Sequence, residues 1–153
     1  MAYKGKYTPS NPSKYHGNAG NIVYRSLLER RFMVYCDTNN AITWWSSEEL
    51  YIPYVSPLDK KWHRYFVDFV IGLRDQNGVE RTVMVEIKPY RQCFEPKVKV
   101  FEGKVDKRKR EYKDYIRSIR DWAINSSKWK AAEEYCKHRG WTFKIITDKD
   151  LKP

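Results

Sequence analysis

The stretch WHRYFVDFVIGLRDQNGVERTVMVEIKP, residues 62–89, contains two strand-like runs on either side of a turn signal. Both runs, at 62–73 and 81–89, are rich in Val, Ile, Phe and Tyr, which favour β-strands. Asn77-Gly78 lies between them, and this pair is typical of tight hairpin turns. We therefore predict two long strands that pair as an antiparallel hairpin.

The elements on both sides of this hairpin follow from hydrophobic spacing and from stop signals. A helix that returns through a glycine to a strand indicates a crossover onto the same sheet. The sequence therefore predicts an α/β fold with a mixed central sheet flanked by helices. The expected elements are a helix over 22–37 ending at Asn39-Asn40, short strands at 41–45 and 50–55, the hairpin, a loop over 89–103, a basic amphipathic helix over 104–120, a second helix capped by Asn125, Ser126 or Ser127 and closed by Gly140, and a strand at 141–147.

Basic residues dominate the composition. Thirty Lys and Arg against nineteen Asp and Glu leave a formal charge of +11 over 153 residues, which favours a polyanion such as DNA as partner. A membrane surface is the weaker alternative, because no amphipathic segment combines a basic face with a broad lipid-facing stripe. No apolar run reaches the roughly 18 residues of a spanning helix either, so we expect no membrane contact. Residues 1–20 interleave Lys with Tyr and contain no acid, so we expect an extended basic arm before a single domain over 21–153. That arm could bind phosphates or bases, or be a flexible terminus that binds nothing.

Cysteine and histidine do not indicate a site of their own. Three cysteines and three histidines are scattered along the chain, without a C-x-x-C pair or a paired-histidine zinc pattern. A disulfide framework is not indicated, and a reducing cytoplasm fits this pattern. Any chemistry should therefore depend on carboxylates and lysine.

Asp68, Glu86 and Lys88 form the strongest candidate constellation. Side chains alternate along a strand, so Met84, Glu86 and Lys88 share one face, which we expect to meet solvent or a cleft. Asp68 lies in an apolar run, where an unpaired carboxylate costs several kcal/mol. Asp68 and Glu86 are each nine residues from Asn77, so the hairpin should bring them into approximate register. Converging carboxylates are stable together with a hard cation such as Mg²⁺, and a nearby lysine can steer an attacking water.

These residues resemble the PD-(D/E)xK nuclease signature, although no proline precedes Asp68. The resemblance implies a restriction-endonuclease-like core in which Asp68, Glu86 and the backbone carbonyl of Ile87 bind Mg²⁺, with Mn²⁺ able to substitute. Lys88 would orient or activate the water. The YRSLLERRF segment offers Glu29 as a further acid, acting directly or through a water.

The chain is more similar still to the head-completion endonucleases of T-even-like tailed phages. The segments that carry this resemblance occur in the same order and cover most of the chain. They are MAYKGKY, SKYHGN, YRSLLERRF, RYFVDFV, VEIKP and NSSKWKAAEEYCKHRGWTFKIIT. The chain also resembles the TnsA transposition nuclease but departs from it at Glu86, where that protein carries glutamine. The resemblance implies a nuclease that trims or finishes packaged double-stranded DNA in the host cytoplasm. It could contact portal or neck proteins and could remain in the virion.

Each of these predictions has a plainer alternative. The acids and Lys88 could form a cross-strand ion pair or a solvated edge, and Glu29 could form an ordinary helix ion pair with Arg25. The basic helix could be a solvated surface rather than a DNA contact. Its candidate DNA-binding residues are Lys107, Arg108, Lys109, Arg110, Lys113 and Arg117. Alternative functions are a structure-selective junction-resolving nuclease, a transposase-type subunit that needs a partner, and a non-catalytic DNA-binding virion adaptor.

Overall fold

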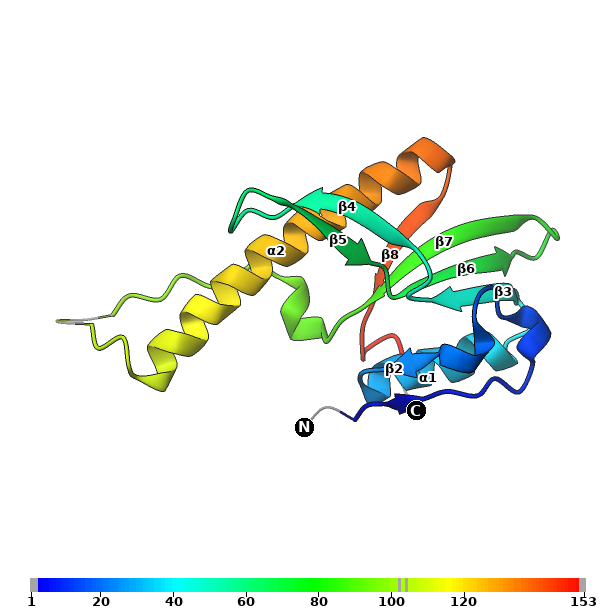
Figure 1. Cartoon of the computed structure of the whole chain (residues 1–153), viewed down its shortest axis with the longest axis horizontal. Helices are drawn as coiled ribbons and strands as arrows, with labels where there is room; N and C mark the ends of the chain where they lie inside the picture. Colours follow the sequence, from blue (N-terminus) through cyan, green and yellow to red (C-terminus); the bar gives the residue numbers. More distant parts are fainter. Residues whose placement is uncertain (1–2, 102, 104, 152–153) are drawn as a thin grey trace.

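A four-stranded mixed sheet forms the centre of the molecule (Figure 1). The structure is a computed structural model that describes residues 3–101, 103 and 105–151. The strand order is β3-β6-β7-β8, in which only the β7/β8 pair is parallel. The elements are β1 (Gly5–Lys6), η1 (Pro12–Lys14), η2 (Ala19–Asn21), β2 (Val23–Tyr24), α1 (Leu27–Thr38), β3 (Ile42–Ser47), β4 (Tyr51–Val55), β5 (Trp62–Phe66), β6 (Phe69–Arg74), β7 (Glu80–Ile87), η3 (Tyr90–Cys93), α2 (Arg110–Arg139) and β8 (Thr142–Ile146).

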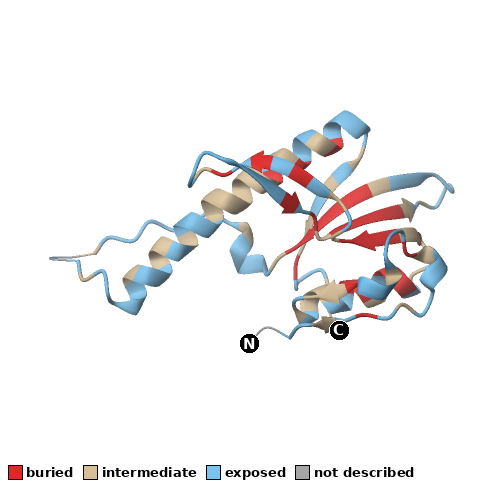
Figure 2. Ribbon diagram, in the orientation of Figure 1, coloured by how far each residue is buried: buried red, intermediate tan, exposed pale blue. Residues whose placement is uncertain are grey.

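Both faces of the central sheet are covered. On one face α1 packs through Phe32 and Cys36 on a core that includes Val85 and Ile87. On the other face the carboxyl-terminal half of α2 and the β4–β5 hairpin enclose Met84. Figure 2 shows the buried residues concentrated on the central strands and on the elements that face them. The predicted α/β class, with a mixed sheet flanked by helices, is confirmed.

The β6–β7 hairpin confirms the pairing predicted across Asn77-Gly78. Phe69 is paired with Val85 and Arg74 with Glu80, and Gly78 has φ 78°, a value that favours glycine. The crossover prediction is also confirmed, because α2 ends at Gly140 in the left-handed conformation and β8 then pairs in parallel with β7.

The long strand predicted over 62–73 is wrong, because the chain breaks it at Val67 and Asp68. Residues up to Phe66 belong to β5, which pairs with β4 in a separate two-stranded sheet, and β6 begins at Phe69. The Val67 N–H donates to the Leu50 carbonyl, and the Asp68 carbonyl accepts from the Glu48 N–H. These bonds hold the chain where it passes from the β4–β5 sheet to the central sheet. The apolar run is continuous through this point, so the sequence pattern does not reveal that the chain changes sheets.

The two helices predicted after residue 103 are one helix of 30 residues, so this prediction is wrong as well. Ser126, expected near a helix start, instead donates its hydroxyl to the Trp122 carbonyl at 2.6 Å, a bond that serines in helix interiors form. The helix also begins at Arg110 rather than near 104, and Lys109 is its N-cap. The amino-terminal half of α2 projects away from the sheet (Figure 1).

The helix predicted over 22–37 begins later, at Leu27. Ser26 is the N-cap, and its hydroxyl accepts from the Glu29 N–H at 3.1 Å. The residues before it form η2 and β2. This capping bond places Glu29 in the first turn of α1, which matters for the site described below.

The amino-terminal segment packs along α1. Tyr7 and Tyr15 are buried, and the Tyr7 hydroxyl donates to Asp37 at 2.7 Å. Lys14 donates to the Cys36 and Asn39 carbonyls at the end of α1, where a cation is favourable. The role of this segment as a separate DNA-binding arm remains a prediction, and its Met1 and Ala2 lie outside the described residues.

Candidate active site

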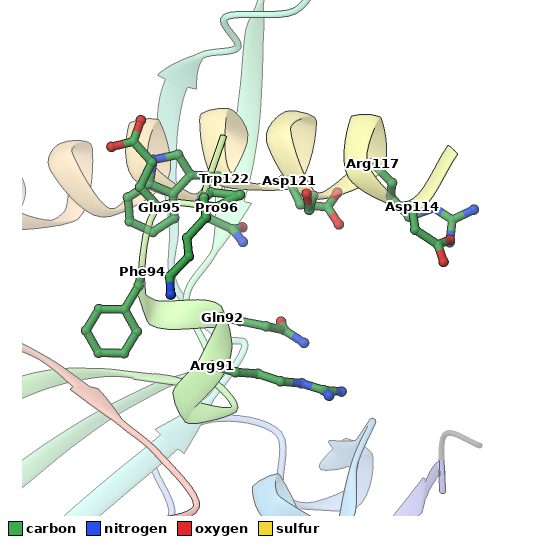
Figure 3. Close-up of a pocket in the computed structure, with 12 residues that line it drawn as sticks. Arg91, Gln92, Phe94, Glu95, Pro96, Asp114, Arg117, Asp121 and Trp122 are labelled. Carbon is green, nitrogen blue, oxygen red and sulfur yellow. The ribbon is translucent and has the colours of Figure 1, made fainter. Parts of the chain in front are cut away.

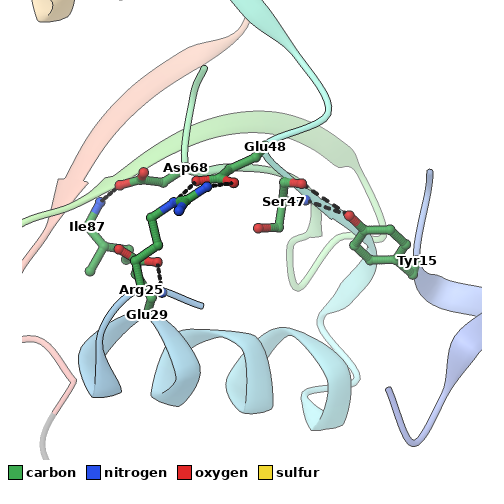
Figure 4. Close-up of polar contacts among 7 residues, drawn as sticks. All are labelled: Tyr15, Arg25, Glu29, Ser47, Glu48, Asp68 and Ile87. Carbon is green, nitrogen blue, oxygen red and sulfur yellow. Dashed lines mark hydrogen bonds and ion pairs between the residues drawn. The ribbon is translucent and has the colours of Figure 1, made fainter. Parts of the chain in front are cut away.

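Asp68 and Glu86 lie where the β6–β7 hairpin meets the β4–β5 hairpin. Asp68 immediately precedes β6, and the Phe69–Val85 pairing brings Glu86 to the corresponding place on β7. The Ile87 N–H donates to the Asp68 carboxylate at 2.8 Å (Figure 4). Burial raises the pKa of Asp68 well above its usual range, and the negative charge of Glu86 raises it further. The predicted convergence of these two carboxylates is therefore present.

Glu86 is buried, with 6% of its surface exposed. Its carboxylate accepts a hydrogen bond from the Tyr65 hydroxyl, which comes from β5. Burial raises the pKa of Glu86, while that hydrogen bond and the charges of Lys88 and Lys128 lower it. The Trp129 indole also lies beside Glu86, but its N–H does not reach hydrogen-bond geometry with any partner in the described part of the chain.

The strand face that carries Glu86 differs from our expectation. We expected Met84, Glu86 and Lys88 to face solvent or a cleft. Met84 is instead fully buried under α2 and the β4–β5 hairpin, and Glu86 is nearly so. Only Lys88, directly after the strand, remains half-buried. The crossover helix covers this face, and exposure returns only past the end of β7, where Lys88 is half-buried and Pro89 is exposed.

Glu29 faces this cluster from the first turn of α1 (Figure 4). Burial raises the pKa of Glu29, and the charges of Glu48 and Glu86 add to that rise. Its carboxylate accepts from the Arg25 backbone N–H at 2.9 Å. The Arg25 guanidinium pairs with Glu48, at 2.9 and 3.1 Å, so the ordinary Arg25–Glu29 side-chain pair that we considered is absent from the described contacts.

Three further residues of the site were not predicted. Glu48 follows β3 at φ 53°, a strained value for a residue with a side chain, and its charge acts on Glu29 and Arg25. Tyr65 and Lys128 contact each other, with the Lys128 ammonium 5.5 Å from the ring centre. The Glu48-Glu49 pair after an aromatic strand was a detectable signal for Glu48. Lys128 had none, because only the packing of α2 brings it to the sheet.

The donor set fits a divalent cation. Within residues 3–101, 103 and 105–151, no three His, Cys, Asp or Glu side chains are close enough together to form a preassembled metal cage. Mg²⁺ commonly uses one or two carboxylates and completes its shell with waters and substrate phosphates. Two desolvated carboxylates with raised pKa values, at the end of β7, match that requirement. Asp68 and Glu86 are the residues that would hold it.

The candidate DNA-binding residues lie at the projecting end of α2. Lys107 and Arg108 are in the turn before the helix, contrary to the prediction that they are helical. Three of the six residues have acidic neighbours, and all these pairs are exposed. The pairs are Arg108–Asp106 at 3.3 Å, Arg110–Asp114 at 3.5 Å and Arg117–Asp114 at 3.7 Å.

A cavity of about 520 Å³ lies between the segment that follows β7 and the first half of α2 (Figure 3). Arg91, Phe94, Arg117 and Trp122 contribute to its wall. None of the four candidate catalytic residues lines it, so we do not assign it to the chemistry.

Comparison with known proteins identifies the family. Residues 39–148 match the family described as TnsA-like endonuclease N terminal. The chain belongs to the TnsA-like endonucleases. It is also 38% identical over 152 residues to the head completion nuclease of Enterobacteria phage T4, an alignment that covers 99% of this chain and 95% of that protein. The family assignment supports a nuclease and a DNA substrate, and endonucleases of this family are generally metal-dependent. No helix in the described part of this TnsA-like chain is long and apolar enough to cross a membrane.

Proposed function

We propose that this protein is a metal-dependent DNA endonuclease of the PD-(D/E)xK type that trims or finishes packaged DNA during phage head completion. The observation that carries the proposal is the convergence of Asp68 and Glu86 at the end of β7, in a chain of an endonuclease family. The phage role rests on the similarity to the T4 head completion nuclease. In this proposal the protein acts in the host cytoplasm during assembly, and portal or neck proteins are its candidate partners.

Each residue of the site has a distinct role in this proposal. Asp68, Glu86 and the Ile87 carbonyl hold Mg²⁺ or Mn²⁺, and Glu29 completes the shell directly or through a water. Such a cation, when bound, polarises a phosphate oxygen and lowers the pKa of a coordinated water. Lys88 positions the attacking water with its point charge. The Ile87 N–H and the Tyr65 hydroxyl hold the two carboxylates in place, because each donates to one of them.

A cleavage assay across DNA structures tests this function. The protein is incubated with linear, nicked, branched and single-stranded DNA in Mg²⁺, Mn²⁺ or EDTA. We expect cleavage in both metals and none in EDTA. Binding without cleavage of every substrate in both metals would favour the virion adaptor and overturn the proposal. Strong preference for four-way junctions over linear DNA would favour a junction-resolving nuclease.

The basic end of α2 contacts duplex DNA in the same proposal. Arg110 is 19 residues from Trp129 along the helix, so this end lies about 28 Å from the site, or roughly eight base pairs of duplex. The charges there are exposed, and Lys107, Lys109 and Lys113 have no ion pair among the described residues. These three lysines are therefore the candidates for phosphate contacts.

Replacing Lys107, Lys109 and Lys113 together by alanine should lower the affinity for duplex DNA. It should also make that affinity less dependent on the salt concentration. Each phosphate contact adds about 0.9 to the slope of log K against log salt, so the slope should fall by about 2.7. Fluorescence anisotropy in EDTA at several salt concentrations measures it. Replacing the exposed lysines Lys130, Lys137 and Lys144 removes the same charge elsewhere and serves as the control. Equal slopes for both triple variants would contradict a DNA contact at this end.

A further inference from the structure

The β4–β5 hairpin presents an apolar, largely aromatic face to solvent. Its inward side chains pack against α2, including Ile52, Tyr54 and Tyr65. Its outward side chains are large and exposed, which is unusual for a two-stranded sheet with nothing packed on that face among the described residues. They are Tyr51, Val55, Trp62 and Phe66, with 45%, 43%, 72% and 48% of their surfaces exposed.

The strand register arranges these side chains as a continuous stripe. Tyr51 is paired with Phe66, and their ring centres are 5.6 Å apart. Val55 is paired with Trp62 at the other end of the hairpin. Arg64 lies between the two pairs, with its guanidinium 5.1 Å from the centre of the Tyr51 ring. We call the face formed by these five residues the hairpin platform.

The hairpin platform begins beside the candidate active site. Phe66 is two residues before Asp68, so their Cα atoms are at most about 7 Å apart. Trp62 lies about 13 Å further along β5. A DNA strand that runs from the carboxylates along β5 would therefore reach Phe66 first and Trp62 last. The β4–β5 hairpin and its direction relative to the central sheet can be followed in Figure 1.

The chemistry of the hairpin platform suits unpaired nucleotides. Aromatic faces stack on bases of any sequence, and basic side chains beside them attract the phosphates. Lys60, Lys61 and Arg64 supply positive charge, and the only acid between Tyr51 and Phe66 is Asp59, which is paired with His63 at 2.7 Å. The two outward rings of β5, Trp62 and Phe66, are four residues and about 13 Å apart, roughly four times the 3.4 Å rise of a duplex strand. Bases within a duplex are covered by their neighbours, so only an unstacked strand can place bases on both rings.

We propose that the hairpin platform binds an unpaired DNA strand next to the scissile phosphate, so that the enzyme acts best on ends, flaps or gaps with exposed bases. This inference rests on the proposed nuclease function, because that function makes the phosphate beside Asp68 and Glu86 the scissile one. The binding itself does not require cleavage. Base stacking on Trp62 and Phe66 supplies the affinity, and Arg64 contacts the backbone.

Replacing Trp62 by alanine tests the proposal. The probe is a fluorescent 20-nucleotide oligothymidylate, with a 20-base-pair duplex for comparison, and both are titrated in EDTA. We expect Trp62→Ala to weaken single-strand binding about 5- to 150-fold, the range for loss of one stacked base, and to change duplex binding less than about two-fold. Trp62→Phe keeps a flat ring and should restore most of the affinity. Because stacking releases no counterions, the loss should be similar at low and high salt.

Tyr35→Ala is the matched control, because Tyr35 is an aromatic residue on α1 that is 42% exposed. Equal affinity of Trp62→Ala, Tyr35→Ala and the parental protein for the oligothymidylate would overturn the proposal. That result would favour a protein as the ligand of the hairpin platform. Failure of the nuclease function would look different. The parental protein would then bind the oligothymidylate in a Trp62-dependent way and cut no substrate in Mg²⁺ or Mn²⁺.

Discussion

Lys88→Ala should abolish cleavage while leaving DNA binding almost intact. Lys88 follows Glu86 by two residues at the end of β7, and it is the half-buried cation of the candidate site that lies directly after the strand. Positioned groups that manage a proton or a water in the transition state typically contribute 10²–10⁴-fold. We expect a loss of about 10³-fold or more, equivalent to roughly 4 kcal/mol in the activation barrier. Affinity should fall less than about three-fold, because one charge among many contributes little to phosphate binding.

Single-turnover cleavage in Mg²⁺ and anisotropy in EDTA measure the two effects separately. Lys144→Ala is the control, since Lys144 is an exposed lysine on the neighbouring strand β8. It should cut at the parental rate. Persistence of parental cleavage in Lys88→Ala would show that the water is positioned by another group, with Lys128 the first to examine because its charge also acts on Glu86.

Asp68→Asn should abolish cleavage and at the same time stabilise the metal-free protein. The substitution removes a desolvated negative charge that lies against Glu86, and the amide oxygen can still accept from the Ile87 N–H. In EDTA at neutral pH we expect Tm to rise by about 2–8 °C, equivalent to about 1–2 kcal/mol. Loss of a ligand should remove the stabilisation that Mg²⁺ gives to the parental protein by binding its folded state.

The pH dependence of stability follows from the same charges. The pKa values of Asp68 and Glu86 are raised in the folded protein, so the folded state holds their protons more tightly than the unfolded state does. Between the unfolded pKa of about 4 and the raised folded values, metal-free stability should therefore fall as pH rises. Asp68→Asn should flatten this decline. Urea unfolding in EDTA from about pH 4.5 to pH 8 measures it.

Asp121→Asn is the control for these measurements, because Asp121 is an exposed carboxylate on α2 outside the site. It should leave Tm, cleavage and the Mg²⁺-induced shift unchanged. A Mg²⁺-induced rise in Tm that is as large in Asp68→Asn as in the parental protein would show that Asp68 is not a ligand. A lower Tm for Asp68→Asn in EDTA would show that the hydrogen bond from the Ile87 N–H to the Asp68 carboxylate stabilises the fold by more than repulsion from Glu86 destabilises it.

Local patterns were sufficient for the elements whose signals lie within a few residues. The Asn77-Gly78 turn, the antiparallel pairing on both sides of it and the stop at Gly140 were all predictable, because turn chemistry and strand alternation act at short range. Asp68 and Glu86 were brought together correctly for the same reason, since a hairpin register relates residues by counting from the turn. The predicted pairing needed no knowledge of the remaining chain.

Errors arose where a long-range partner changed the outcome. The apolar run at 62–73 contains no local break, yet a bond from Val67 to Leu50 turns the chain into a second sheet. Asn125 to Ser127 look like a helix start, but packing on the sheet and on the β4–β5 hairpin keeps α2 continuous through them. Burial of Met84 and Glu86 likewise depends on α2, which follows them by more than twenty residues.

By itself the sequence determined the α/β class, the hairpin and the pair of carboxylates at its open end, because each depends on alternation and on counting along one stretch of chain. The tertiary structure alone decided what surrounds that pair. It brought Glu48 from the end of β3, Tyr65 from β5 and Lys128 from α2 to the place where Glu29, already suggested by the family resemblance, also lies. Desolvation and charge proximity raise the carboxylate pKa values, and both depend on distances between segments that no local pattern encodes.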